Sequence, residues 1–89
     1  MIESYVSRVE EACGSTQTKD YIVILKFDKR DEATRKVLAR STILKEVPGI
    51  VVKADYRGVE FTVFRNGRII FKSLKDRGEL NSILENLLK

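Results

Sequence analysis

The chain has 89 residues, and 43% of them are hydrophobic, which suits one domain with a thin core. Lys and Arg exceed Asp and Glu by 17 to 13, and the net charge of +4 favours polyanionic partners only mildly. Because the chain has no His and one Cys, the sequence excludes Ser-His-Asp and Cys-His nucleophilic catalysis and a His/Cys zinc site. We therefore expect neither an enzyme nor a cofactor nor a metal.

The sequence also carries no membrane or secretion signal. There is no run of about 18 apolar residues to span a bilayer, and no basic stretch followed by an apolar core at the N-terminus. We therefore expect an intracellular, cytoplasmic protein that does not bind membranes. Cys13 has no partner for an internal disulfide, and we interpret it as a small buried helix residue rather than a reactive thiol.

The N-terminal segment has apolar residues at helical spacing. This pattern predicts a short amphipathic helix over residues 2–13, ended at Gly14, and a polar linker follows over residues 15–19. We therefore divide the chain into an N-terminal helix and linker, residues 1–19, and one folded domain, residues 20–89. The helix would cover a surface of its own chain or dock on a second one.

The next segment predicts a strand followed by a helix. Residues 21–27 are rich in β-branched and aromatic side chains, and a helix over about 30–41 would follow, with Asp28 or Asp31 as its cap. These two carboxylates and Glu32 could also be imagined as a divalent-metal cluster. Carboxylates at a helix start are mostly caps and dipole partners, so capping is the favoured interpretation.

Residues 50–72 alternate with a period of two, as expected for strands with one covered face. The side chains expected under the helices are Ile50, Val52, Ala54, Val59, Phe61, Val63, Ile69 and Phe71. The opposite, open face is expected to carry Val51, Lys53, Asp55, Glu60, Thr62, Phe64, Arg68, Ile70 and Lys72. Asn66-Gly67 predicts a type I′ hairpin turn, which needs positive φ at both central residues.

The C-terminal segment predicts a helix. Its apolar residues follow the i, i+3, i+4, i+7 spacing, and Asp76 with Glu79 resembles a capping box. The apolar residues are Leu80, Ile83, Leu84, Leu87 and Leu88. They would cover the sheet face that carries Phe61, Val63 and Phe71.

Three blocks in the strand region and one upstream carry a family resemblance. They are Pro48-Gly49-Ile50-Val51-Val52-Lys53, Val63-Phe64-Arg65-Asn66-Gly67-Arg68, Ile69-Ile70-Phe71-Lys72-Ser73-Leu74-Lys75 and the upstream Tyr21-Ile22-Val23-Ile24. In order and without a gap from Pro48 to Lys75, these blocks resemble one repeat of the TATA-box-binding protein (TBP), over residues 20 to 88. The resemblance implies a further strand over residues 42–47, with Pro48 at an edge or bend.

The resemblance, with the predicted N-terminal helix, implies an α+β fold in the order α-β-α-β-β-β-β-α. One curved antiparallel sheet would have its helices on a single face. Because the family saddle is made of two repeats and this chain has length for one, two chains would have to form it. We therefore expect a homodimer, which would also protect sheet edges and an uncovered apolar strip formed by Val23, Leu25, Val51, Phe64 and Ile70.

The resemblance also implies a site on the open sheet face. Phe64 matches a phenylalanine that wedges between base pairs, and Lys53 matches a phosphate-contacting arginine. Val23, Thr62 and Ile70 match groove-facing positions. Basic residues on the last hairpin add to this surface, namely Arg65, Arg68, Lys72 and Lys75. The sequence departs from the family pattern at Tyr21, Val47 and Lys72.

Two functions follow from these observations. The first is a nucleic-acid-binding homodimer, acting on duplex DNA and related to transcription. The second is a protein-interaction or regulatory module that keeps the fold without binding DNA, because Glu60 and Asp55 lie on the face that would meet phosphates. In that case Phe64 would be buried under the N-terminal helix or at a dimer seam, and the basic residues would protect an edge.

Overall fold

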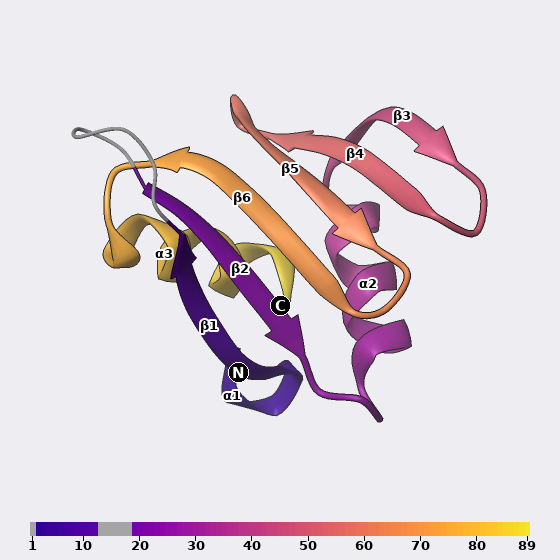
Figure 1. Ribbon diagram of the computed structural model, residues 1–89, viewed down its shortest axis with the longest axis horizontal. Helices are drawn as coiled ribbons and strands as arrows, with labels where there is room; N and C mark the ends of the chain where they lie inside the picture. Colours follow the sequence, from indigo (N-terminus) through magenta and orange to yellow (C-terminus); the bar gives the residue numbers. More distant parts are fainter. Residues whose placement is uncertain (1, 13–18) are drawn as a thin grey trace.

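The computed structural model describes residues 2–12 and 19–89, and its centre is a six-stranded antiparallel sheet. The strands lie in the order β1-β2-β6-β5-β4-β3 (Figure 1). In chain order the elements are α1 (Ile2–Tyr5), β1 (Val6–Ala12), β2 (Lys19–Leu25), α2 (Arg30–Ala39), β3 (Thr42–Val47), β4 (Val51–Tyr56), β5 (Val59–Phe64), β6 (Arg68–Leu74) and α3 (Arg77–Leu87).

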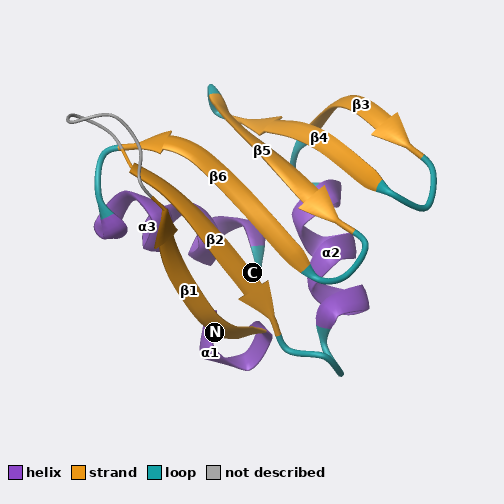
Figure 2. Cartoon of the chain, in the orientation of Figure 1, coloured by secondary structure: helices purple, strands orange, loops and turns teal. Residues whose placement is uncertain are grey.

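Helices α2 and α3 lie on the same face of the sheet (Figure 2). Alternate residues of β2, β5 and β6 point into this layer, where Phe61 and Phe71 stack with ring centroids 5.0 Å apart. The largest fully buried side chains are Phe71, Ile69, Leu74, Leu80, Leu84, Leu87, Leu88, Val23 and Val37. The expected α+β architecture with helices on one face is therefore confirmed.

The helix predicted over residues 2–13 is wrong. Only Ile2–Tyr5 are helical, and Val6–Ala12 form a strand that pairs antiparallel with β2. Val6 and Val9 pack against the core from this strand. The apolar spacing that predicted a helix therefore belongs to an edge strand. The pairing satisfies the outer backbone groups of β2, which a helix would leave open. Cys13, Gly14 and linker residues 15–18 lie outside the described residues, and Lys19 belongs to β2.

Tyr5 connects this N-terminal segment to the rest of the domain. Its ring is buried in the core, and its hydroxyl donates a 2.6 Å hydrogen bond to Glu32 Oε2 on α2. The Lys36 ammonium lies 4.9 Å from the centre of the same ring. The segment before β1 therefore docks on α2 of its own chain. This is one of the two placements expected for the N-terminal segment, the other being a second chain.

The type I′ turn predicted at Asn66-Gly67 is wrong, and the type I′ pattern lies one hairpin earlier. Arg57 (φ 53°) and Gly58 (φ 84°) form the two-residue loop between β4 and β5, both with positive φ. At the β5–β6 turn, only Gly67 has positive φ, and its N–H donates to Phe64 O at 3.1 Å. This is the three-residue hairpin loop, in which the last residue takes the left-handed conformation.

The expected strand over residues 42–47 is present as β3, and Pro48 follows it in a turn. The Ile50 N–H donates to Val47 O at 3.0 Å, and Gly49 has φ 76°. Pro followed by a positive-φ Gly is the composition of a type II turn. The prediction that Pro48 lies at a bend is confirmed.

The two long helices begin differently. Lys29 occupies the N-cap of α2 without a side-chain hydrogen bond, so the expected cap by Asp28 or Asp31 is wrong. At α3 the predicted cap is confirmed, because Asp76 Oδ1 accepts the Glu79 N–H at 2.9 Å. The Glu79 carboxylate accepts the Lys75 N–H in return. The start of α3 is therefore held by side chains, whereas α2 depends on packing of Ala33 and Val37.

An irregularity at the end of β6 returns the chain to the core. Lys72 and Ser73 are both exposed, and Leu74 is fully buried, so the alternation shifts by one residue. Ser73 takes the left-handed conformation, with φ 60°, and its N–H donates to Asp20 Oδ1 at 3.0 Å. The β2–β6 register shifts at the same level. This arrangement has the properties of a β-bulge.

Candidate nucleic-acid interface

The open face of the sheet is the surface that neither α2 nor α3 covers. The register places Ile22 opposite Ile70, Ile70 opposite Thr62, and Thr62 opposite Lys53, in one row across β2, β6, β5 and β4. Directly opposed residues share a face of the sheet, so all four side chains lie on the open side. Residues far apart in the sequence thus form one continuous surface.

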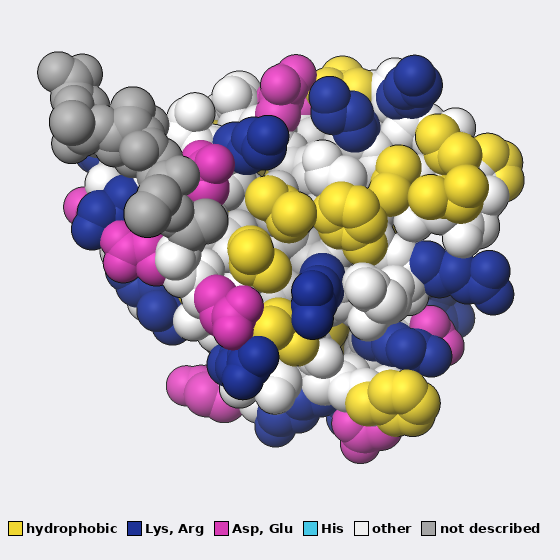
Figure 3. All heavy atoms as spheres, viewed as in Figure 1, with side chains coloured by type: hydrophobic (Ala, Val, Ile, Leu, Met, Phe, Trp, Pro, Cys, Tyr) yellow, Lys and Arg dark blue, Asp and Glu magenta, His cyan; other side chains and the backbone are white. Residues whose placement is uncertain are grey.

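An apolar strip crosses this face. It consists of partly buried side chains from five strands, namely Ile22, Ile24, Ile70, Phe64, Val51 and Val47. Figure 3 shows the band of hydrophobic side chains running across the molecule between charged groups. Phe64 on β5 is opposite Val51 on β4, which is opposite Val47 on β3, so two valines continue the strip from the aromatic ring to the β3 edge.

Basic residues flank the strip on both sides. The exposed cations on the open face are Arg8, Lys45, Lys53, Arg68 and Lys72. Acidic groups are also present there: Glu10 pairs with Arg8 at 3.0 Å, and Asp55 accepts the Gly58 N–H at 3.3 Å. Glu60 lies opposite Asp55. The acids therefore gather near two corners of the face, and the centre of the strip is lined by cations and apolar groups.

The expected placement of two residues in the uncovered strip is wrong. Val23 is 0% exposed and Leu25 is 5% exposed, because both point into the helix-covered layer. Their neighbours Ile22 and Ile24 occupy the open face instead. Tyr21, aligned with a groove-reading position of the family, is also buried. Every residue from Tyr21 to Leu25 is apolar, so the sequence pattern of this strand cannot distinguish its two faces.

The other expected site residues divide into two groups. Lys53, Thr62, Phe64, Ile70 and the β6 residues Arg68 and Lys72 all belong to the open face. Arg65 lies in the β5–β6 turn, and Lys75 follows β6 in the segment leading to α3. Ile22, Ile24 and Arg8 also lie on this face, although they were not among the expected site residues. The strand pairing of β1 and β2, which places these residues, is a long-range property of the fold.

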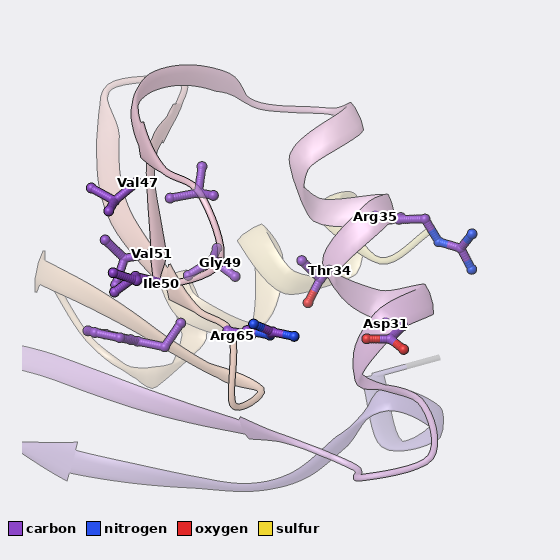
Figure 4. A pocket seen from close by; sticks show the side chains of 11 residues that line it. Asp31, Thr34, Arg35, Val47, Gly49, Ile50, Val51 and Arg65 are labelled. Carbon is purple, nitrogen blue, oxygen red and sulfur yellow. The ribbon is translucent and has the colours of Figure 1, made fainter.

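A cavity of about 550 Å³ separates α2 from the β3–β4 turn. One wall is apolar, with Val47, Ile50 and Val51. Ile50 is 62% exposed there, so its expected place under the helices is wrong, because it lies in the turn before β4 begins. Figure 4 shows Arg65 reaching across toward α2, whereas Arg35 points away. Arg65 is thus directed to the side of the sheet end rather than onto the open face.

A second hollow, of about 590 Å³, lies over the other end of the open face. Lys53, Glu60, Thr62, Ile70 and Lys72 contribute to its lining. The hollow shows that the open face is concave where β4, β5 and β6 meet.

Two groups with a shifted pKa, Glu32 and Lys19, lie outside the open face. The hydrogen bond from Tyr5 lowers the pKa of Glu32, with smaller contributions from nearby lysines and Arg35. Glu11 raises the pKa of Lys19 through a 2.6 Å ion pair. Both effects belong to contacts that hold the N-terminal segment in place, and neither indicates a catalytic group.

Within residues 2–12 and 19–89, no group of three or more Cys, Asp or Glu side chains is placed to hold a metal ion. In the same described part of the chain, no helix has the length and apolar character needed to cross a membrane. Comparisons with protein-family models, with curated proteins and with solved structures found no match. The resemblance to a TBP repeat therefore remains a prediction.

Proposed function

We propose that this protein binds duplex DNA through the open face of its sheet, as a small TBP-like protein acting in transcription. The observation that carries the proposal is the apolar strip with Phe64, flanked by exposed Lys and Arg side chains on a concave, uncovered surface. Such a surface matches minor-groove binding, in which apolar side chains contact base edges and cations contact phosphates. The proposal keeps the cytoplasmic location expected from the sequence.

The arrangement of elements supports the TBP-like part of the proposal. Residues 19–87 run β-α-β-β-β-β-α, which is the order that the resemblance implies for one repeat. Phe64 and Lys53 lie on the same face of adjacent strands, because Lys53 on β4 is opposite Thr62, which comes two residues before Phe64 on β5. A wedge residue and a phosphate contact must share a face to act on one duplex.

A second candidate function is binding of a protein partner through the same face. It is favoured by the acidic pair Asp55 and Glu60, which would face phosphates at one corner. The apolar wall formed by Val47, Ile50 and Val51 is also suited to a hydrophobic side chain. DNA binding is preferred because five exposed cations lie on the open face against three acids, and one of these acids, Glu10, is paired with Arg8.

The proposal is tested by titrating a labelled duplex with the protein at several salt concentrations. We expect the affinity to fall as the salt concentration rises. Lys53→Ala should make the slope of log affinity against log salt concentration shallower by about one unit. Lys89→Ala is the matched control, because Lys89 follows α3 on the other side of the sheet, and its slope should equal that of the parent protein.

Phe64→Ala tests the wedge. Its salt slope should remain near the parent value, but duplex bending measured by energy transfer between the DNA ends should decrease, since wedging acts through unstacking. Phe27→Ala is the matched control, because Phe27 is 80% exposed in the β2–α2 segment and lies outside the apolar strip. Absence of salt-dependent binding at low ionic strength would reject DNA binding and leave the protein-partner function.

A further inference from the structure

The two edges of the sheet are β1 and β3, and they differ in their capacity to pair with a second copy of the chain. Among the described residues, β1 pairs with β2 only, so its outer backbone N–H and C=O groups have no strand beside them. β1 extends over seven residues without proline, and its register is regular from Arg8 to Ala12. An exposed edge of this kind is a template for another strand unless charges or bulges prevent pairing.

The charges of β1 are arranged so that they permit pairing in one register. Arg8 and Glu10 both lie on the open face, opposite Ile24 and Ile22 of β2. Val9 lies between them on the covered face, opposite Val23, and packs against the core. The strand therefore has a cation, a central valine and an anion in symmetric positions.

We propose that a second copy of this chain pairs with β1 antiparallel about a twofold axis at Val9. In this register Val9 faces Val9 of the second copy, and each Arg8 faces the Glu10 of the other chain. Moving by one residue would place open-face side chains against the covered face. Moving by two residues would set Arg8 against Arg8 or Glu10 against Glu10, and like charges directly opposite each other are destabilising.

The other edge strand, β3, is less suited to pairing with a second copy. Lys45 lies on the open face, opposite Lys53, and Glu46 lies on the covered face, opposite Val52. No register that keeps both open faces on the same side can therefore pair Lys45 with Glu46 of another copy. Both edge strands carry a register irregularity, and bulges protect edges from pairing. In β3 it lies between Ile43 and Lys45, whereas in β1 it lies between Val6 and Arg8 and leaves Arg8 to Ala12 regular.

Pairing through β1 would join two six-stranded sheets into one sheet of twelve strands. Because the twofold axis is perpendicular to the sheet, both open faces would lie on the same side, and the two apolar strips would approach each other across the seam. The inference deepens the proposed function, since it supplies the two-chain surface that the function requires. Its test, however, uses no DNA.

Charge reversal tests the register. The parent protein should show a concentration-dependent monomer–dimer equilibrium in sedimentation velocity, and Arg8→Glu or Glu10→Arg should each weaken it by at least about tenfold, because both cross-strand pairs become like-charged. An equimolar mixture of the two variants should form a heterodimer, since every carboxylate at these positions in one variant then faces a guanidinium of the other. Lys45→Glu is the control on β3 and should leave the dimer constant unchanged.

A crosslink provides an independent measurement. In a Cys13→Ser background, Val9→Cys should oxidise to a disulfide-linked dimer, because opposed residues in an antiparallel pair have Cα atoms about 4.5–5.5 Å apart. Ser7→Cys in the same background should crosslink far less, since Ser7 would face Glu11 of the other chain.

The outcomes separate the two proposals. A parent protein that stays monomeric at all concentrations would overturn the dimer, and loss of dimer in Lys45→Glu alone would place the interface at β3 instead. If the variant mixture fails to associate although the parent dimerises, the Val9-centred register is wrong. A dimer with these properties that does not bind duplex would retain the interface and reject the DNA-binding function.

Discussion

Ser73→Gly is expected to stabilise the protein, although most substitutions in a strand by Gly are destabilising. Ser73 has φ 60°, a conformation that costs a residue with a Cβ about 1–2 kcal/mol and that Gly adopts freely. The hydrogen bond to Asp20 uses the Ser73 backbone N–H, so it survives the change. The greater freedom of Gly in the unfolded chain offsets about half of the gain, which leaves about 0.5–1 kcal/mol.

The assay is urea unfolding followed by circular dichroism, with a thermal scan alongside. For a chain of this length the expected gain corresponds to a rise in Tm of about 2–8 °C. Ser82→Gly is the matched control, because Ser82 is exposed in the middle of α3 and the same chemical change should there cost about 0.5 kcal/mol. If both substitutions are destabilising by similar amounts, the backbone strain attributed to Ser73 is absent.

Two further predictions concern the core and the N-terminal contact. Phe71→Ala should destabilise the domain by about 3–5 kcal/mol in urea unfolding, because Phe71 is fully buried and stacks on Phe61, and a smaller loss would mean that the core collapses around the gap. Tyr5→Phe should raise the pKa of Glu32 toward its ordinary value in a carboxyl NMR titration. Because a lowered folded pKa contributes stability above the unfolded pKa and loses it as pH falls, the variant should be less stable at neutral pH and the difference should shrink in acid. An unchanged titration of Glu32 would refute the role of the Tyr5 hydroxyl.

The elements with clear periodicity could be predicted from the sequence. The alternation of β4 and β5, with Lys53, Thr62 and Phe64 on one face, is decided by polar residues at every second position. The C-terminal helix and its Asp76 cap are equally local features. In these cases the hydrophobic pattern and the capping chemistry act over a few residues, so no distant contact is needed to determine them.

The incorrect predictions concern segments in which the local sequence pattern fits two structures equally well. In β2, residues Tyr21 to Leu25 are all apolar, so the assignment of Val23 to the open face depended on the family alignment, and a shift of one residue reverses every side chain. In the N-terminal segment, Tyr5, Val6 and Val9 fit a helix as well as a strand with one partly buried side. The free edge of β2 resolved that ambiguity, and this edge exists only after the sheet has formed.

The pairing of β2 with β6 has a consequence for how the chain folds. β1 with β2, and β3 through β6, are runs of strands in which neighbours in sequence are also neighbours in the sheet. The contact that joins them, Tyr21 opposite Phe71, connects residues from the two ends of the chain. Closing such a long loop costs entropy before any core contact compensates for it, so we expect the pairing of β2 with β6 to limit the speed of folding.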